Sequence, residues 1–202
     1  MELGYINKNI VLIGEFKPTT FDKLAFIKSG LLSEDDFLEG SMFLPDLTII
    51  DTPNLVIEIN SNRFSINFKF VEFNLNHDNL KVLFSNSRIN AFGFNFKRTV
   101  FINQVNETKK FFYFESNILN DYFDSESAAY GYYISKDYVG GRLKLDIKPV
   151  QLQKIDENKL LNAMDFSFNF HVESSNFFEH FERFDIYENH TLEIVSNYGK
   201  ES

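Results

Sequence analysis

The chain has 202 residues and a formal net charge of −9, with 44% hydrophobic and 24% charged residues and no cysteine. This length fits one globular domain, and the composition is that of an ordinary folded protein. The lack of cysteine excludes disulfides, thiolate catalysis and cysteine-ligated metal centres. The negative charge opposes binding to nucleic acid or to an anionic membrane, because no basic cluster in the sequence offsets it.

Phenylalanine is the unusual component, since 25 Phe accompany 9 Tyr while Trp is absent. Phe, Asn, Lys, Ile and Tyr share AT-rich codons, so genome composition explains most of this enrichment. Each buried ring removes a large apolar area from water. We therefore expect a Phe-rich core.

The N-terminal residues Met-Glu-Leu-Gly-Tyr lack the basic and apolar regions of a signal peptide. No apolar run reaches the ~18 residues that a membrane span needs. The sequence therefore predicts a cytoplasmic chain without membrane contact.

The first half begins with an apolar run at 9–16 that predicts a buried strand, which Pro18 ends. Two short helices are expected next, at 19–30 behind a threonine cap and at 33–38 behind Ser33. The remaining predicted elements of this half are a strand at 47–50, a hairpin of strands 54–59 and 63–70, a helix within 78–85 and a strand at 89–102.

Two of these strands place apolar residues at every second position. The inward positions are Phe64, Ile66, Phe68 and Phe70 in the first and Phe92, Phe94 and Phe96 in the second. This period is typical of antiparallel strands with one buried face. The Asn-Ser-Asn sequence at 60–62 has the residues of a hairpin turn.

In the second half, a helix is expected at 106–119, although the aromatic run 111–114 fits a strand equally well, and a polar loop follows at 121–126. Strands are predicted at 130–135, 142–148 and 164–172, and helices at 177–181 and 187–198. Leu143, Leu145 and Ile147 are expected to face inward. In the last strand Phe166, Phe168, Phe170 and Val172 face inward, and Asp165, Ser167, Asn169 and His171 face outward.

These elements predict an α+β fold, with an antiparallel or mixed β-sheet, several short helices on one of its faces and a Phe-rich core. Residues 1–202 are expected to form a single domain. Both parts of the chain offer a strand pair, a helical stretch and a further strand. An alternative is therefore a subdivision into two similar halves, 1–104 and 105–202.

Residues Asn9 to Pro18 read NIVLIGEFKP, an apolar strand that ends in a Gly-x-Phe-x-Pro turn ahead of Phe21 and a short helix. This segment resembles the opening of a sporadically distributed, uncharacterised bacterial protein family. The resemblance continues through Gly30-Leu-Leu32 with Glu34-Asp35, Asn62-Arg63-Phe64 and Ala91-Phe92-Gly93-Phe94-Asn95, and covers roughly the first half of the chain. It implies a bacterial cytosolic protein, such as an accessory product of a mobile or defence-associated locus, and it implies no activity or catalytic residue.

The histidines do not have the spacing of a metal site. His77, His171, His180 and His190 form no His-Glu-x-x-His motif. The densest polar cluster contains Glu179, His180, Glu182, Asp185, Glu188 and His190. On a helix, successive residues lie about 100° apart, so no single face collects three ligands. We therefore predict no metal ligand and no cofactor.

Asp165, Ser167 and His171 share the polar face of one predicted strand. Alternate residues of a strand lie about 7 Å apart, which is too far for a direct Ser–His–Asp relay. No Gly-x-Ser-x-Gly sequence is present, and Gly140-Gly141 lacks the Lys-Ser/Thr of a phosphate-binding loop and is expected to form a turn. No catalytic residue is predicted.

Two further patterns have simple structural explanations. The acidic pairs Asp35-Asp36 and Asp156-Glu157 stand where helices are expected to start, and there the helix dipole stabilises them. The aromatic stripes could stack on nucleic-acid bases, but without flanking Lys or Arg they are expected to be buried.

The leading hypothesis is a non-enzymatic accessory or binding protein that acts through protein–protein contacts, including self-association. The alternatives are a metal-dependent hydrolase whose carboxylates come from separate segments, and an acidic nucleic-acid mimic. An aromatic stripe that proves exposed would mark a protein-binding surface.

Overall fold

The computed structural model describes residues 2–70, 72–73, 75–101, 131–154 and 159–198. The described strands are β1 (Glu2–Glu15), β2 (Met42–Phe43), β3 (Thr48–Asp51), β4 (Leu55–Ile59), β5 (Arg63–Phe68), β6 (Arg88–Phe101), β7 (Tyr132–Tyr138), β8 (Gly141–Lys154) and β9 (Lys159–Val172). The described helices are α1 (Lys23–Lys28), α2 (His77–Leu83), α5 (Phe177–Phe181), α6 (Phe184–Asn197) and the 3₁₀ turns η1 (Pro18–Thr20) and η2 (Glu34–Asp36).

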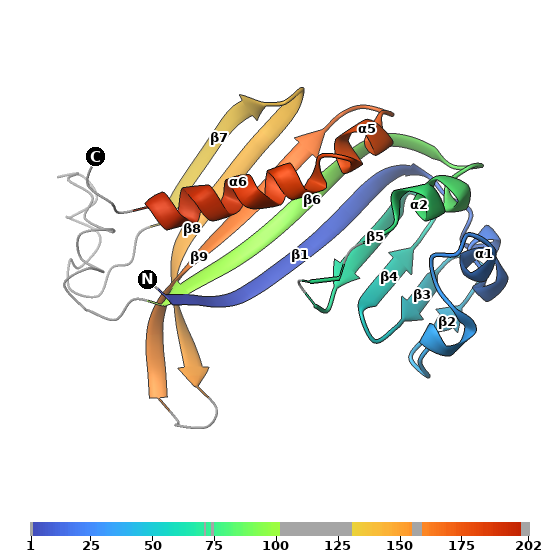
Figure 1. The fold of residues 1–202 in the computed structure, drawn as a ribbon, viewed down its shortest axis with the longest axis horizontal. Helices are drawn as coiled ribbons and strands as arrows, with labels where there is room; N and C mark the ends of the chain where they lie inside the picture. The colour runs from blue at the N-terminus through green and yellow to red at the C-terminus, as the bar shows by residue number, and fades with distance from the viewer. Residues whose placement is uncertain (1, 71, 74, 102–130, 155–158, 199–202) are drawn as a thin grey trace.

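The strands form one nine-stranded sheet in the order β2-β3-β4-β5-β1-β6-β9-β8-β7 (Figure 1). All of its pairings are antiparallel. The long strands β1 and β6 lie side by side at its centre. Strand β5, which precedes α2, pairs with β1. Strand β9, which precedes α5, pairs with β6. The predicted α+β class is confirmed, and of the two predicted sheet types, antiparallel or mixed, the described strands form the antiparallel one.

Phenylalanine rings on one face of the central strands form much of the core, together with aliphatic side chains such as Ile10, Leu12 and Ile66. Across β6 and β9, Phe94 is the partner of Phe170, and Phe96 is the partner of Phe168. All four rings are buried, as are the next rings along, Phe92 and Phe166. Alternate side chains of a strand point to opposite faces of the sheet. The polar residues that alternate with these rings therefore lie on the face opposite the rings.

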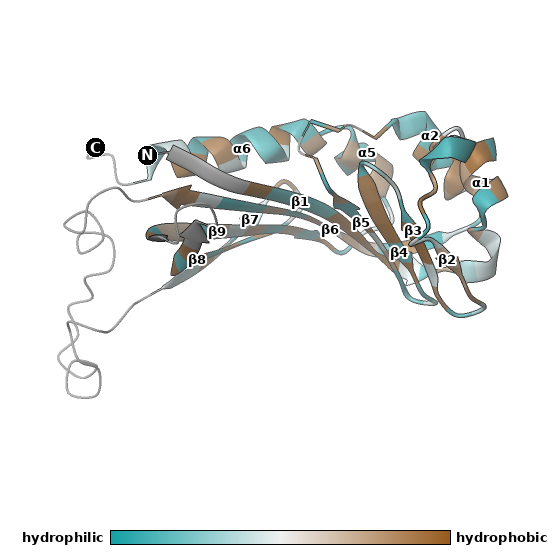
Figure 2. Cartoon of the chain, turned by 90° about the horizontal axis from the view of Figure 1, so that it is seen from below, coloured by the Kyte–Doolittle hydropathy of each residue, from teal (hydrophilic) through white to brown (hydrophobic). Residues whose placement is uncertain are grey.

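The helices lie along the face that carries these rings (Figure 2). The buried residues of α6 recur at helical spacing and comprise Phe184, Tyr187, Thr191 and Val195. Phe184 and Tyr187 both contact the Phe94 ring, at centroid distances of 5.2 and 5.3 Å. This stripe is the usual amphipathic pattern of a helix that packs on a sheet, and it holds α6 across β6 and β9.

Most predicted elements are confirmed, but three expectations need correction. The helix expected at 19–30 is divided into η1 and α1, and the one expected at 33–38 is only the turn η2, where Asp36 accepts hydrogen bonds from both the backbone and the side chain of Ser33. Phe70 is 59% exposed rather than inward, because β5 ends at Phe68. The segments 106–119 and 121–126 and the pair Asp156-Glu157 lie outside the described residues.

The hairpin between β7 and β8 has an unfavourable residue in its turn. Tyr138 and Gly141 are strand partners, so Val139 and Gly140 are the two turn residues. Both have positive φ, 46° for Val139 and 76° for Gly140, as a type I′ turn requires. A β-branched side chain such as valine rarely adopts this conformation.

Val139→Asn should therefore stabilise the protein by about 1 kcal/mol, because Asn-Gly suits a type I′ turn and asparagine tolerates positive φ. The midpoint of thermal unfolding should rise by about 2–4 °C. Val82→Asn, at an exposed valine in α2, is the matched control and should give no gain. An equal effect of the two substitutions would contradict this explanation.

Candidate functional site

The four histidines contact different partners. His77 stacks on Phe181, His180 of α5 contacts the Tyr187 hydroxyl, and His190 stacks on Tyr138 with ring centroids 4.8 Å apart. His171 lies on the opposite face of the sheet. Among the described residues no three His, Asp or Glu side chains gather as a metal site would require.

Asp165 is buried, although the sequence pattern predicts that it faces solvent. Its Oδ1 accepts a hydrogen bond from Thr99 at 2.5 Å, and its Oδ2 lies 2.6 Å from Lys97 Nζ. The strand prediction placed it on the correct face, but the neighbouring strand β6 covers the carboxylate. His171 instead lies 3.7 Å from Glu173, so the structure does not bring Asp165, Ser167 and His171 together.

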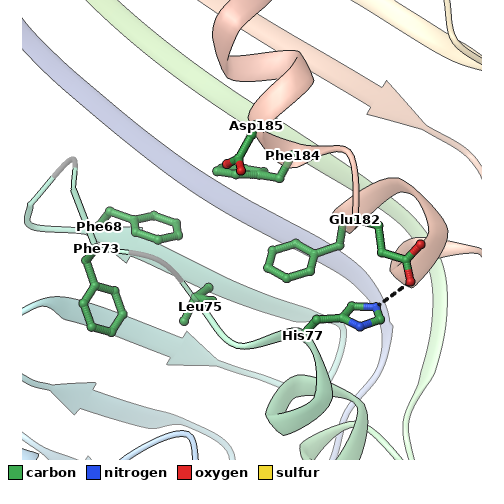
Figure 3. Close-up of a pocket in the computed structure, with 8 residues that line it drawn as sticks. Phe68, Phe73, Leu75, His77, Glu182, Phe184 and Asp185 are labelled. Atoms are coloured by element: carbon green, nitrogen blue, oxygen red, sulfur yellow. Dashed lines mark ion pairs between the residues drawn. The ribbon is translucent and has the colours of Figure 1, made fainter.

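An aromatic pocket of about 230 Å³ lies between the segment that follows β5 and the junction of α5 and α6 (Figure 3). Its apolar lining consists of Phe68, Phe73, Leu75, Phe181 and Phe184. Its polar lining consists of His77, Glu182 and Asp185. His77 Nε2 lies 3.5 Å from Glu182 Oε1 on one side of the pocket, which links the start of α2 to the residue that follows α5. The pocket therefore has aromatic walls and an acidic rim.

A buried lysine lies against the rings that form this pocket. Lys8 on β1 is only 2% exposed, and its Nζ lies 5.0 Å from the Phe68 ring centroid and 5.7 Å from that of Phe184. Glu188 on α6 neutralises it, with Lys8 Nζ 3.3 Å from Glu188 Oε2. The positive charge lies over the electron-rich faces of both rings. This cation–π interaction stabilises the positions of the two rings.

Glu188 also binds a second buried cation, Arg98 on β6. Arg98 Nη2 lies 3.8 Å from Glu188 Oε1 and donates a hydrogen bond to the Glu188 carbonyl oxygen at 3.2 Å. Arg98 Nε donates to Thr191 Oγ1 at 2.6 Å. Burial lowers the pKa of Arg98, and Glu188 opposes that effect. This cluster connects α6 to two strands of the sheet.

Neither the pocket nor the buried cations were predicted from the sequence. The alternation that places Phe92, Phe94 and Phe96 on the inward face also places Arg98 there, so the burial of Arg98 could have been predicted from the pattern. The pocket could not, because its two sides are more than 100 residues apart in the chain and neither contains a motif.

A scan against protein-family models and a search of curated proteins found no match to this chain.

None of the helices in the described ranges is long and apolar enough to cross a membrane.

Glu188→Gln should lower the free energy of unfolding by roughly 3 kcal/mol, because it leaves Lys8 and Arg98 without their shared carboxylate. Urea denaturation measures the loss. Glu193→Gln on the same helix is the control and should change stability by less than about 0.5 kcal/mol, since that side chain is 70% exposed. Similar losses in both variants would contradict a role for the cluster.

His180 should make stability depend on pH. Its Nδ1 lies 2.7 Å from the Tyr187 hydroxyl, and burial lowers its pKa, with a further contribution from Arg183. The unfolded chain therefore binds this proton more tightly. The contribution of neutral His180 is fully present above the unfolded pKa of about 6.5 and is lost as the pH falls below it.

Urea unfolding at about pH 7.5 and about pH 5.5 tests this dependence. The wild-type chain should lose more stability over this interval than His180→Gln, whose side chain can still hydrogen-bond to Tyr187 but does not titrate. An identical loss in the two proteins would contradict the assignment to His180.

Proposed function

We propose that this chain is a non-enzymatic accessory protein that binds other proteins, and that the aromatic pocket of Figure 3 receives an anchoring side chain of the partner. The observation that carries this proposal is a concave aromatic site with exposed carboxylates at its rim, next in sequence to exposed apolar residues. Phe70 and Ile186, which adjoin the pocket segments, are 59% and 60% exposed. Exposed apolar groups around a concave aromatic site are typical of protein-interaction surfaces.

The charge of the rim indicates the chemistry of the partner. Glu182 and Asp185 are exposed at the mouth of the pocket, and the whole chain carries a net charge of −9. A partner segment with a bulky apolar residue beside lysine or arginine would complement this site. The apolar residue would pack against the aromatic walls, and the cation would pair with the acidic rim. At about 230 Å³, the pocket suits one large side chain rather than a complete small-molecule ligand.

Self-association would use a different part of the sheet. The edge strand β2 and the residue after it expose Met42, Phe43 and Leu44 by 46%, 42% and 47%. An edge strand with unpaired backbone groups and apolar side chains can pair with another chain. Light scattering after size-exclusion chromatography measures this association directly.

We also propose that residues 1–202 form one domain built from two similar halves, 1–104 and 105–202. In support, each half contains a strand that returns antiparallel to a long strand of the sheet: β5 in the first half lies beside β1, and β9 in the second half lies beside β6, which itself belongs to the first half. A helix follows the returning strand in both cases. A cytoplasmic accessory role in a bacterial defence or mobile locus agrees with the family resemblance of the first half.

A panel of fluorescent peptides tests the pocket. Each peptide has a central Phe, Leu or Met flanked by Lys and Arg, by Ser, or by Glu, and fluorescence anisotropy gives the affinity. Peptides with basic flanks should bind most tightly, and Asp185→Lys should lower the affinity of the protein for these peptides about tenfold. Glu39→Lys makes the same charge change at an exposed site away from the pocket and should have little effect.

The proposal fails if no peptide of the panel binds and the protein is a strict monomer in light scattering. It also fails at this pocket if Asp185→Lys and Glu39→Lys weaken binding equally, because net charge alone would then explain the preference.

A further inference from the structure

The sheet face opposite the helices carries two adjacent rows of polar side chains that cross five strands. The first row is Asn9, Asn95, Asn169, Lys144 and Ser135, which are successive cross-strand partners on β1, β6, β9, β8 and β7. The second row is Asn7, Lys97, Ser167, Asp146 and Tyr133 on the same strands. Together, all of these except Ser135 line a groove of about 510 Å³. Its size is that of a small-molecule site.

Three asparagine amides in the first row are held in fixed orientations. Asn95 Nδ2 donates a hydrogen bond to Asn9 Oδ1 at 2.7 Å, and Asn169 Nδ2 donates one to Asn95 Oδ1 at 2.5 Å. Each amide has two donors and two acceptor lone pairs, so the ladder leaves further N–H and C=O capacity on three side chains that line the groove. Preorganised amides with both kinds of capacity suit a ligand with several neighbouring hydroxyl groups.

The groove also contains a lysine, Lys144, that is not paired with any carboxylate of the described residues. Lys97 is paired with Asp165 at 2.6 Å, and Asp146 is paired with Lys148 at 2.7 Å. Lys144 lies between these pairs, is only partly exposed, and makes no ion pair within the described part of the chain. The groove is therefore locally positive on a chain of net charge −9. It is complementary to a ligand with a single anionic group.

The remaining features restrict the ligand further. Tyr133 is 66% exposed at the β7 end of the groove, where its ring can lie against the C–H face of a sugar. Phe96 and Phe168 contribute only backbone to the lining, because their side chains are buried on the helix side of the sheet. Tyr133 is thus the one aromatic side chain that the described lining presents to a ligand, and the net charge of the chain repels a polyanion such as nucleic acid.

We propose that this groove binds an acidic oligosaccharide, with a sugar carboxylate on Lys144, hydroxyl groups on the amide ladder and a sugar ring against Tyr133. The site lies on the opposite face from the aromatic pocket and uses none of its residues. It therefore adds a second ligand to the proposed protein-binding function, and either proposal can fail without the other.

The test uses the full-length protein and a panel of oligosaccharides that contain glucuronate, galacturonate or sialate, each paired with its carboxyl-reduced counterpart. Isothermal titration calorimetry measures the dissociation constants. At least one acidic member should bind, and its reduced counterpart should bind about tenfold more weakly, because a charge-assisted hydrogen bond is lost.

Two variants locate the binding on the groove. Lys144→Gln should reduce affinity for the acidic oligosaccharide about tenfold and leave affinity for the reduced one unchanged. Asn169→Ala should lower the affinity for both ligands, because the substitution removes one end of the amide ladder. Lys28→Gln, at an exposed lysine on α1, is the charge-matched control and should change neither.

Three results would overturn the proposal. The first is that no acidic oligosaccharide of the panel binds. The second is that acidic and reduced ligands bind equally. The third is binding that Lys144→Gln affects no more than Lys28→Gln does. Thermal unfolding of each variant shows whether it is folded, and Ser167→Ala replaces Asn169→Ala if the latter is not.

Discussion

The face of the central strands that carries phenylalanine is the constraint on which the rest of the structure depends. The rings of β6 and β9 are paired across the sheet and covered by α5 and α6. Burial of this row provides a large apolar area, and Phe92, Phe94, Phe96 and Phe170 also contact other rings edge-on or tilted. Because the strand period is two, burying every second residue leaves the alternate residues, which are mostly polar, on the reverse face. The aromatic pocket lies at the margin of the buried face, and the polar groove occupies the reverse face.

The cluster of Lys8, Arg98 and Glu188 interrupts an otherwise apolar interface between α6 and the sheet. Removing such charges from water is costly, so the cluster is poor evidence for added stability. It does restrict geometry, because α6 must place Glu188 between two cations on neighbouring strands, with Thr191 one turn later against Arg98. We infer that its main contribution is to define the position of α6, and with it Phe184 and Asp185 at the pocket.

Prediction from sequence succeeded where a signal is local. The Asn60 side chain accepts hydrogen bonds from the backbone of Asn62 and Arg63, which is the turn chemistry that the Asn-Ser-Asn sequence indicated. Alternation identified the buried row of β9, and apolar spacing identified α6. Prediction failed where a distant segment decides the environment. Phe70 continues the alternation of β5 but follows its last paired residue, and Asp165 is covered by the side chains of β6.

The sequence by itself determined the buried rows of phenylalanine on β6 and β9, the faces of the main strands and the acidic charge, because composition and a period of two are properties of consecutive residues. Only the tertiary structure decided which strands are neighbours. Strand order brings Asn9, Asn95 and Asn169 into one ladder, although they are more than 70 residues apart in sequence. It also brings Phe73 to the same pocket as Phe184. Neither the choice of partner strand nor the register has a signature in one strand alone, since both depend on the two partners and on the core they bury together.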